Sequence, residues 1–365
     1  MPVHNAFNGI YKGKKVLITG DTGFKGSWLS IWLKELGAEV YGYALPAKSD
    51  KDNFERCNLK SIIHHKDGDI RDKETVVKYF QEVGPDICFH LAAQPLVLES
   101  YENPHYTFET NLMGAVNFFE AVRNTKTVKA AINITSDKCY HNNEWNWGYR
   151  ENEPMGGDDP YSASKGCSEL ISNAYQKSFF NSDSHCKIAT ARAGNVIGGG
   201  DWAENRIVPD FFRALNENKK LNIRNPYSTR PWQHVLEPLS GYLWLGTKLF
   251  EEGEKFSSGW NFGPLDAANR SVMELINSIS EFLGKGQYLI GEEKLFHEAS
   301  LLKLDISKAI NLLEWYPTLN FIETIQYTAS GYMAETNNCV MLNERIKQIE
   351  NYSLSASSKK IKWSL

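Results

Sequence analysis

Tyr161 and Lys165 are four positions apart, a spacing that places two side chains on the same face of a helix. An ammonium beside a phenol lowers the pKa of the phenol, so that a tyrosine can exchange protons near neutral pH. Such a tyrosine can accept the proton of a hydroxyl group while a hydride leaves the carbon that carries it. A Tyr/Lys pair at this spacing is common, so its function can be inferred only together with other motifs of the chain.

Ser136, Asp137 and Lys138 directly follow an apolar run that is typical of a buried strand. Alone, this triplet would more often cap a helix or form a turn. Together with Tyr161 and Lys165, it predicts an active site in which Ser136 hydrogen-bonds the reacting hydroxyl. Asp137 adds an acid that plain alcohol oxidation does not need, and this surplus indicates a second chemical step.

A glycine-rich turn follows the apolar run at 15–19 and opens a helical pattern at 28–36. Its G-x-x-G-x-x-G spacing lets the backbone approach a pyrophosphate, which the N–H groups and positive dipole of the helix N-terminus can bind. A bare glycine triplet is more often a plain turn, but a strand before it and a helix after it favour a dinucleotide. The expected contacts are Gly20, Thr22, Gly23, Phe24, Lys25 and Gly26, with Tyr161 and Lys165 at the nicotinamide end.

Two further segments are candidates for cofactor contact. Asp69 and Ile70 are expected to flank the adenine, although a simple loop explains them equally well. Leu91, Ala92 and Ala93 end an apolar run with small residues, which suits either a passing cofactor or close packing. The expected second strand, 39–43, ends without an acidic residue, so this stretch does not separate NAD from NADP.

Alternating strands and helices predict an α/β fold, a doubly wound parallel (Rossmann) sheet with a smaller C-terminal substrate-binding lobe. The expected strands are 15–19, 39–43, 86–91, 130–135 and 188–192, and the expected helices include 28–36, 72–82, 106–124 and 161–180. We predict a dinucleotide-binding Rossmann domain of 1–194 with 235–262, a smaller substrate-binding lobe of 195–234 with 263–345, and a C-terminal tail of 346–365; the resemblance described below implies NAD for the first and a nucleotide sugar for the second.

The composition excludes several classes of protein. A net charge of −4 without a large basic block argues against nucleic acid as a partner, and no apolar run approaches the ~20 residues of a membrane span. The six cysteines are scattered and lack metal-ligand spacing, so we expect reduced thiols and no metal site. Residues 1–15 lack the apolar core of a signal peptide. We therefore expect a cytoplasmic protein.

On these motifs the chain resembles the nucleotide-sugar 4,6-dehydratases, a branch of the extended short-chain dehydrogenase/reductase family. The resemblance covers most of residues 12–265. The glycine turn and the Tyr/Lys pair are generic to the superfamily. Two segments are more specific, namely 191–202 (ARAGNVIGGGDW) and 230–238 (RPWQHVLEP).

The resemblance implies that the protein holds NAD tightly and uses CDP-glucose as its substrate. It also implies that the product is used in deoxysugar synthesis. Oxidation at C4, loss of water across C5–C6 and hydride return to C6 would give a 4-keto-6-deoxy sugar, with Asp137 protonating the departing hydroxyl. Lys138 stands where related dTDP-glucose dehydratases have a glutamate base. A lysine with its reference pKa of ~10.4 is protonated at neutral pH, so Lys138 is either a strongly perturbed base or a stabiliser of the enolate.

The resemblance also implies substrate contacts. Arg230 is expected to bind the diphosphate as a planar bidentate donor, although an arginine before proline is ordinarily a surface residue. Trp202 is expected to stack on the sugar or base, although aromatic residues are usually core. Further substrate contacts are expected from Gln94, Asn195 and Arg206. The helices at 106–124 and 161–180 are expected to form a homodimer or else to bury against the sheet.

Three alternatives remain open on the sequence. A 4-epimerase of the same fold needs Ser136 and the Tyr/Lys pair, but has no use for Asp137 and Lys138. A 4,6-dehydratase acting on a UDP-, dTDP- or GDP-linked sugar differs only in base recognition. A non-catalytic dinucleotide-sensing protein would be expected to have lost Ser136 or the Tyr/Lys pair, and this chain retains them.

Overall fold

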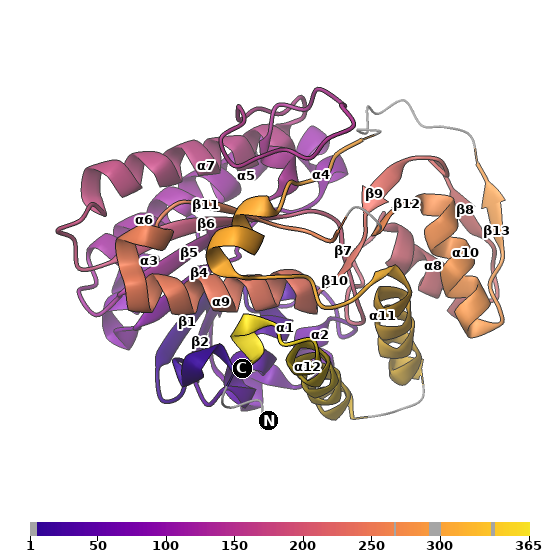
Figure 1. The fold of residues 1–365 in the computed structure, drawn as a ribbon, viewed down its shortest axis with the longest axis horizontal. Coiled ribbons are helices and arrows are strands. Elements are labelled where there is room, and N and C mark those ends of the chain that lie inside the picture. The colour runs from indigo at the N-terminus through magenta and orange to yellow at the C-terminus, as the bar shows by residue number, and fades with distance from the viewer. Residues whose placement is uncertain (1–5, 266–267, 292–300, 337–339) are drawn as a thin grey trace.

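The centre of the computed structural model is a seven-stranded sheet with the strand order β11-β6-β5-β4-β1-β2-β3 (Figure 1). The structure describes residues 6–265, 268–291, 301–336 and 340–365. Each neighbouring pair of strands in the sheet is parallel. The predicted α/β fold class is therefore confirmed. The strands are β1 Lys15–Thr19, β2 Glu39–Ala44, β3 His64–Asp67, β4 Ile87–His90, β5 Ala130–Ile134, β6 Lys187–Ala193 and β11 Gly259–Phe262.

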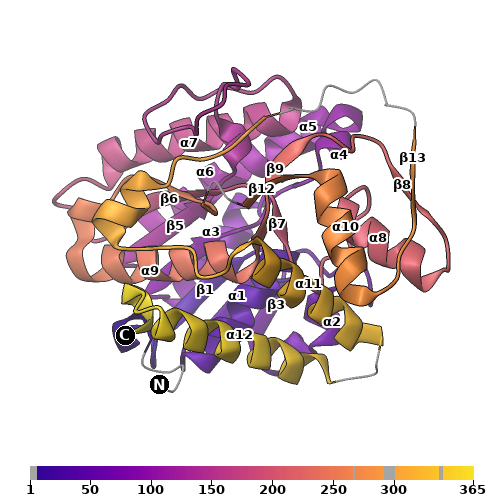
Figure 2. The same cartoon turned by 45° about the vertical axis from the view of Figure 1, so that its right-hand side comes forward.

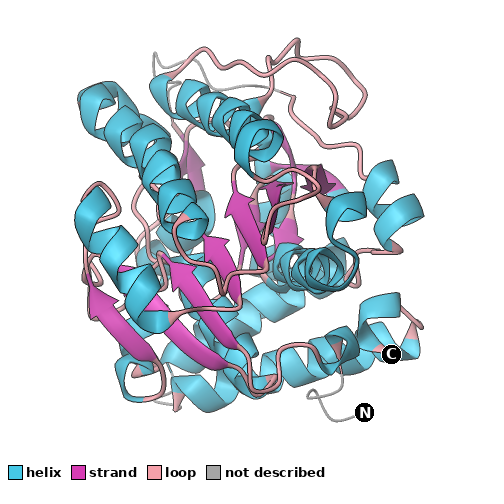
Figure 3. Cartoon of the chain, turned by 90° about the vertical axis from the view of Figure 1, so that its left-hand side faces the viewer, coloured by secondary structure: helices cyan, strands magenta, loops and turns pink. Residues whose placement is uncertain are grey.

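Helices cover both faces of the sheet, as the view in Figure 3 shows. Along β1, Val16 and Ile18 belong to one buried cluster and Leu17 to another, because successive side chains of a strand point to opposite faces. The Leu17 face carries α3 Lys73–Val83, α6 Gly114–Arg123 and α7 Pro160–Phe179. The opposite face carries α1 Phe24–Glu35, α9 Leu236–Glu252 and α12 Met341–Ser358.

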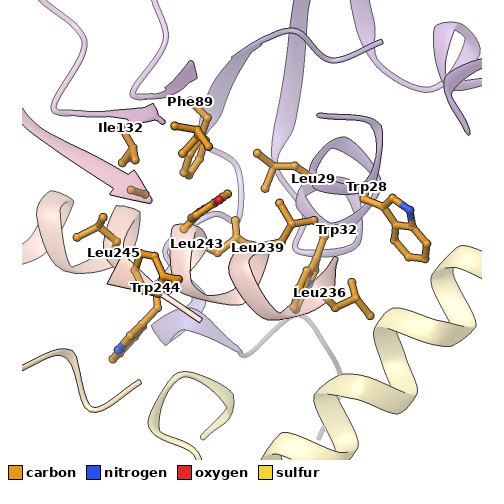
Figure 4. Packing of buried hydrophobic residues seen from close by; sticks show 14 of the residues in the cluster. Trp28, Leu29, Trp32, Phe89, Ile132, Leu236, Leu239, Leu243, Trp244 and Leu245 are labelled. Carbon is orange, nitrogen blue, oxygen red and sulfur yellow. The ribbon is translucent and has the colours of Figure 1, made fainter. Parts of the chain in front are cut away.

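The cluster on the second face is rich in large side chains. Trp32 of α1 faces Leu239 of α9, and Phe89 of β4 lies above Leu243 (Figure 4). Trp28, also of α1, lies on the side away from α9. All five side chains are fully buried. Burial of a large apolar side chain contributes about 1.5–3 kcal/mol, so this contact fixes α1 and the turn before it firmly on the sheet.

A third buried cluster lies in the smaller group of elements at the right of Figure 1. Three two-stranded sheets organise it, namely β7 with β10, β9 with β12 and β8 with β13. The elements are β7 Val196–Ile197, α8 Ile207–Asn216, β8 Leu221–Ile223, β9 Thr229–Pro231, β10 Gln233–His234, β12 Asn269–Ser271, α10 Val272–Leu283, β13 Tyr288–Ile290 and α11 Phe321–Thr336. The domain bounds given above remain a prediction.

Two segments differ from their sequence-based description. The helix expected at 106–124 is built from α5 Pro104–Phe108, a π-helical turn at Glu109–Met113, and α6. The expected tail at 346–365 supplies most of α12 and a final 3-10 turn, Lys362–Ser364, and the rings of Tyr352 and Trp363 are fully buried and stacked. The C-terminus is thus part of the core of the Rossmann half. No helix among the described residues is long and apolar enough to cross a membrane.

Candidate active site

The candidate site lies where the strand order reverses, between β1 and β4. Connections leave these two adjacent parallel strands in opposite directions, and ligands of such sheets bind outside their carboxyl ends. The segments that follow β1, β4, β5 and β6 meet at this edge. They contain most of the predicted site residues.

The glycine turn after β1 is tightly packed. Gly20 has φ +80°, and a Cβ on it would lie 2.6 Å from the backbone nitrogen of Ala92. A Cβ on Gly26 would lie 2.0 Å from the carbonyl oxygen of Gly20. Gly23 is the N-cap of α1 and provides no side-chain cap for the first-turn N–H groups. This uncapped N-terminus fits the pyrophosphate of a dinucleotide.

The other predicted cofactor residues surround this turn. The Thr22 hydroxyl donates to the carbonyl oxygen of Leu45 at 2.9 Å, which ties the turn to the end of β2. Asp69 accepts hydrogen bonds from Arg71, which hold the pKa of its carboxyl below the usual range. Ile70 is buried. Ala92 packs directly on the glycine turn, so the small residues after β4 serve close packing there, and contact of all these residues with a cofactor remains a prediction.

Ser136 and Asp137 form the centre of the site at the end of β5. The Ser136 hydroxyl donates to Asp137 Oδ1 at 2.9 Å and accepts from the backbone N–H of Lys138 at 3.2 Å. Asp137 is 3% exposed, and its Oδ2 is buried without a hydrogen-bond partner among the described residues. Burial raises the pKa of Asp137, against the opposing charge of Lys138. A carboxyl with one free oxygen and a raised pKa suits a general acid.

Gly194 explains how Asp137 finds room. A Cβ at this position would lie 3.0 Å from Asp137 Oδ2 and 3.2 Å from the Pro231 side chain. Any larger residue would therefore press on the free oxygen of the acid. Sequence reasoning placed Gly194 only at a domain boundary and missed this relation.

Tyr161 and Lys165 lie on the first turns of α7, which Asp159 caps through a hydrogen bond from the N–H of Ser162. Burial raises the pKa of Tyr161 to about 12, and a hydrogen bond with Ser136 opposes this shift. Burial lowers the pKa of Lys165 to about 8. The Lys165 ammonium is 3.4 Å from the carbonyl oxygen of Ile134. The structure thus brings Tyr161 together with Ser136, and places Lys165 one helical turn away.

Lys25 points towards this same cluster. Its ammonium is 3.5 Å from the Tyr242 hydroxyl. Burial and the charge of Lys165 lower the pKa of Lys25 to about 8, whereas the charge of Asp137 opposes the shift. Sequence reasoning assigned Lys25 to cofactor binding alone, because its neighbours here come from distant segments.

The two predicted arginines also approach the acid and the tyrosine. Arg206 is paired with Asp201 at 2.9 Å, and Asp201 raises the pKa of Arg206, with a smaller contribution from Tyr161. Arg230 on β9 is buried, and its positive charge lowers the pKa of Asp137 against the larger effect of burial. Positively charged side chains therefore approach Asp137 and Tyr161 from this side of the site, where they could bind an anionic group.

The remaining predicted substrate residues are placed differently. Gln94 is 4% exposed, and its side-chain amide binds the Leu96 backbone and the Thr107 hydroxyl, so its polar groups are used inside the protein. Trp202 is half-buried and donates to Glu335. Asn195 follows β6 and is half-buried. Their contact with substrate remains a prediction.

Among the residues that the structure describes, no three His, Cys, Asp or Glu side chains are arranged to hold a metal ion.

A parallel Rossmann sheet that carries a Tyr/Lys pair, a serine and a buried acid at its carboxyl edge has the arrangement of a short-chain dehydrogenase/reductase. More narrowly, the chain belongs to the GDP-mannose 4,6 dehydratase family, whose model matches residues 17–328. It is 49% identical to the CDP-glucose 4,6-dehydratase of Salmonella typhimurium over 354 residues, which cover 96% of this chain and 98% of that protein. It is 29% identical to the dTDP-D-glucose 4,6-dehydratase of Dictyostelium discoideum, over 73% of this chain and 62% of that protein. The predicted family is confirmed.

Solved structures share the fold at lower identity. The dTDP-glucose 4,6-dehydratase DesIV of Streptomyces venezuelae, with NAD and TYD bound, has a TM-score of 0.75 at 21% identity and covers 90% of this chain and 99% of its own. The epimerase Mth375 of Methanothermobacter thermautotrophicus has a TM-score of 0.78 at 24% identity, over 92% of this chain and 96% of its own. Dehydratases and epimerases thus share this architecture, and the distinction between them lies in the site.

Proposed function

We propose that this enzyme is an NAD-dependent lyase that converts CDP-glucose to CDP-4-keto-6-deoxy-glucose. The observation that carries the proposal is the buried Asp137, which accepts from Ser136 through Oδ1 and keeps Oδ2 without a partner among the described residues, in a site that also holds Tyr161 and Lys165. An epimerase has no need of this acid. The choice of CDP rests on the relative of Salmonella typhimurium, which is 49% identical over nearly the whole chain.

The reaction begins at the sugar C4 hydroxyl. Tyr161 takes the hydroxyl proton, Ser136 holds the oxygen by a hydrogen bond, and the Lys165 ammonium favours the phenolate. The glycine turn would hold NAD, which would supply an acceptor for the hydride that leaves C4 and a donor for its return to C6. Because the hydride is returned, the sugar loses one water overall and no net oxidant is consumed.

Elimination of water needs an acid that protonates the C6 hydroxyl and a group that stabilises the enolate formed when the C5 proton leaves. Asp137 protonates the departing C6 hydroxyl, for which its raised pKa is suited. The positive charge of Lys138 acts directly on Asp137. We assign Lys138 to electrostatic stabilisation of the enolate that forms when another basic group takes the C5 proton.

Substrate binding is assigned to the cationic side of the site. Arg230 and Arg206 are proposed to bind the diphosphate, because both approach the cluster from the smaller group of elements. Trp202 is proposed to contact the substrate on the same cationic side of the site. Gln94 is proposed to act through its packing, since its side-chain amide and both of its backbone polar groups are already bonded within the protein.

We further propose a cytoplasmic homodimer that feeds deoxysugar synthesis. The described cysteines are free thiols, which suits a reducing compartment. Met113 of the π-helical turn and Leu170 of α7 are 45% and 58% exposed, although both are large apolar residues. A dimer through these helices would cover them, and Leu170→Glu should then shift the sedimentation coefficient to that of a monomer.

The function is tested with pure protein and CDP-glucose, with and without added NAD. A product lighter by one water, formed without net NADH, is the expected result in mass spectrometry. Conversion of UDP- or dTDP-glucose in place of CDP-glucose would contradict the choice of base. Inertness towards all three sugars with NAD supplied would overturn the proposal.

A further inference from the structure

Arg345 of α12 has a fully buried guanidinium with a partner for each of its three nitrogens. Its Nε donates to Asn53 Oδ1 at 2.8 Å, its Nη1 donates to the Gly331 carbonyl oxygen at 3.2 Å, and its Nη2 pairs with Glu335. Helix α12 runs beside α1, α2 and α11 at this point (Figure 2). A buried charge costs several kcal/mol unless it is paired, so such a residue demands an explanation.

One side of this guanidinium holds the loop at 198–206, which contains two of the predicted substrate residues, Trp202 and Arg206. A Cβ on Gly199 would lie 2.6 Å from Arg345 Nη1, so the loop backbone rests directly on the guanidinium. Glu335, the ion-pair partner of Arg345, also accepts a hydrogen bond from Trp202 Nε1 at 2.7 Å. The Trp28 indole donates to the Gly199 carbonyl oxygen at 3.0 Å.

The same loop carries Arg206. The Tyr332 hydroxyl of α11 donates to the Asp201 carbonyl oxygen at 2.6 Å, and the Asp201 carboxylate holds Arg206 at 2.9 Å. Gly200, directly before Asp201, has φ +84°, and a Cβ on it would lie 2.6 Å from the Asn53 side chain. Asn53 therefore touches both Arg345 and this loop.

The other side of the guanidinium leads to the glycine turn. The Asn53 amide, which accepts from Arg345, donates through Nδ2 to Ser27 Oγ at 3.0 Å. Ser27 Oγ in turn donates to the carbonyl oxygen of Phe24 at 2.9 Å. An unbroken series of hydrogen bonds therefore joins Trp202 to the first turn of α1, with Arg345 in its middle.

We infer that Arg345 is a positioning residue that seats the substrate loop 198–206 and joins it to the cofactor turn, so that nucleotide and NAD each strengthen the binding of the other. The inference rests on the proposed function for the identity of the two ligands. Linkage makes the effect reciprocal: if the nucleotide strengthens NAD binding by a given factor, NAD strengthens nucleotide binding by the same factor. Arginine is suited to this position because its planar fork can bind Asn53, Gly331 and Glu335 at once.

The experiment measures coupling directly, with CDP as the nucleotide probe. Isothermal titration gives the Kd of NAD with and without saturating CDP for the wild type, Arg345→Met and Arg345→Lys. We expect CDP to tighten NAD binding roughly tenfold in the wild type. Both variants should bind CDP roughly tenfold more weakly and lose most of the coupling. Arg345→Lys keeps the charge and is the variant to use if Arg345→Met does not fold.

Tyr352→Phe is the matched control, because Tyr352 lies on the same helix and is equally buried but bonds Glu237 and Ser240 instead. It should lower the melting temperature and leave coupling at the wild-type value. Unchanged coupling in Arg345→Lys, or no coupling in the wild type, would overturn the inference. Turnover of CDP-glucose by the wild type is measured separately, so a wrong substrate is recognised by inertness and a wrong role for Arg345 by binding.

Discussion

The carboxylate of Glu169 lies 2.8 Å from the guanidinium of Arg192, one helical turn beyond Lys165 on α7. Both side chains are buried, and Thr190 donates a further hydrogen bond to Glu169 at 2.7 Å. Although burial opposes it, Arg192 holds the pKa of Glu169 below its usual range. The negative charge of Glu169 in turn raises the pKa of Lys165 against the larger effect of burial. The spacing 161, 165 and 169 is the signal by which the sequence could have revealed this support.

Replacing Glu169 by glutamine should therefore destabilise the protein strongly. The change leaves a buried Arg192 without its counter-charge, which typically costs about 3–5 kcal/mol. Denaturant unfolding at neutral pH checks the free energy of unfolding. Glu252→Gln is the control, because Glu252 forms an ion pair with Lys248 at the surface and its loss should change stability little. Equal stability of the two variants would contradict the structural role of the pair.

Tyr161→Phe should abolish the first oxidation. The variant keeps the ring and loses the hydroxyl that exchanges the proton, so turnover should fall by about 10²–10⁴. Stopped assays of CDP-glucose consumption check the rate, and isothermal titration with CDP shows whether the nucleotide still binds. Near-normal turnover would refute the assignment of Tyr161.

Asp137→Asn should separate oxidation from elimination. An amide cannot protonate the C6 hydroxyl, whereas Ser136, Tyr161 and Lys165 remain in place for chemistry at C4. Addition of CDP-glucose should then produce the absorbance of reduced nicotinamide, and no dehydrated sugar should form. Unchanged formation of the keto sugar would show that another group is the acid.

Lys138→Met should slow elimination more than oxidation. The variant removes the positive charge proposed to stabilise the enolate, which is worth several kcal/mol in comparable oxyanion sites. Exchange of the C5 proton with deuterated solvent, followed by mass spectrometry, checks this step. Lys138→Arg keeps the charge but is a poor base, so it distinguishes the two roles. Recovery of exchange in the arginine variant supports stabilisation, and loss in both variants favours a basic lysine.

Sequence patterns predicted the central strands because parallel strands are covered on both faces and therefore form continuous apolar runs. The bounds of β1 agree with the prediction, Lys15–Thr19. Strand β3 escaped notice because it is the edge strand and reads His-His-Lys-Asp, without an apolar side chain. The C-terminal helix was taken for a tail because only one of its faces is buried, so its overall composition is polar.

The candidate site residues predicted from the sequence are those that lie in local motifs. Ser136, Asp137 and Tyr161 stand at the ends of recognisable elements, and the sheet brings those ends together. The contact of Arg345 with Asn53 spans 292 positions and leaves no mark in local spacing. Lys25 is similar, since Tyr242 is 217 positions away. Such partners follow only from the tertiary arrangement.

Lys25 should lower the stability of the folded protein and also act on the acid Asp137. It carries a positive charge in the first turn of α1, where the helix dipole is also positive, and burial with the charge of Lys165 lowers its pKa to about 8 from 10.5. Between these values the unfolded chain binds more protons than the folded one, so the stability of the wild type should rise with pH across this window. Lys165, with a pKa of about 8, contributes in the same direction.

Lys25→Met removes one of the two contributions. The variant should be more stable than the wild type at pH 7, and its stability should rise less steeply between pH 8 and 10.5, as measured by denaturant unfolding at several pH values. Because the charge of Lys25 lowers the pKa of Asp137, its removal should also move the alkaline limb of turnover to higher pH. Lys25→Arg keeps the charge at every pH and should leave that limb at its lower position. An identical pH profile of turnover in both variants would show that Lys25 does not act on the acid.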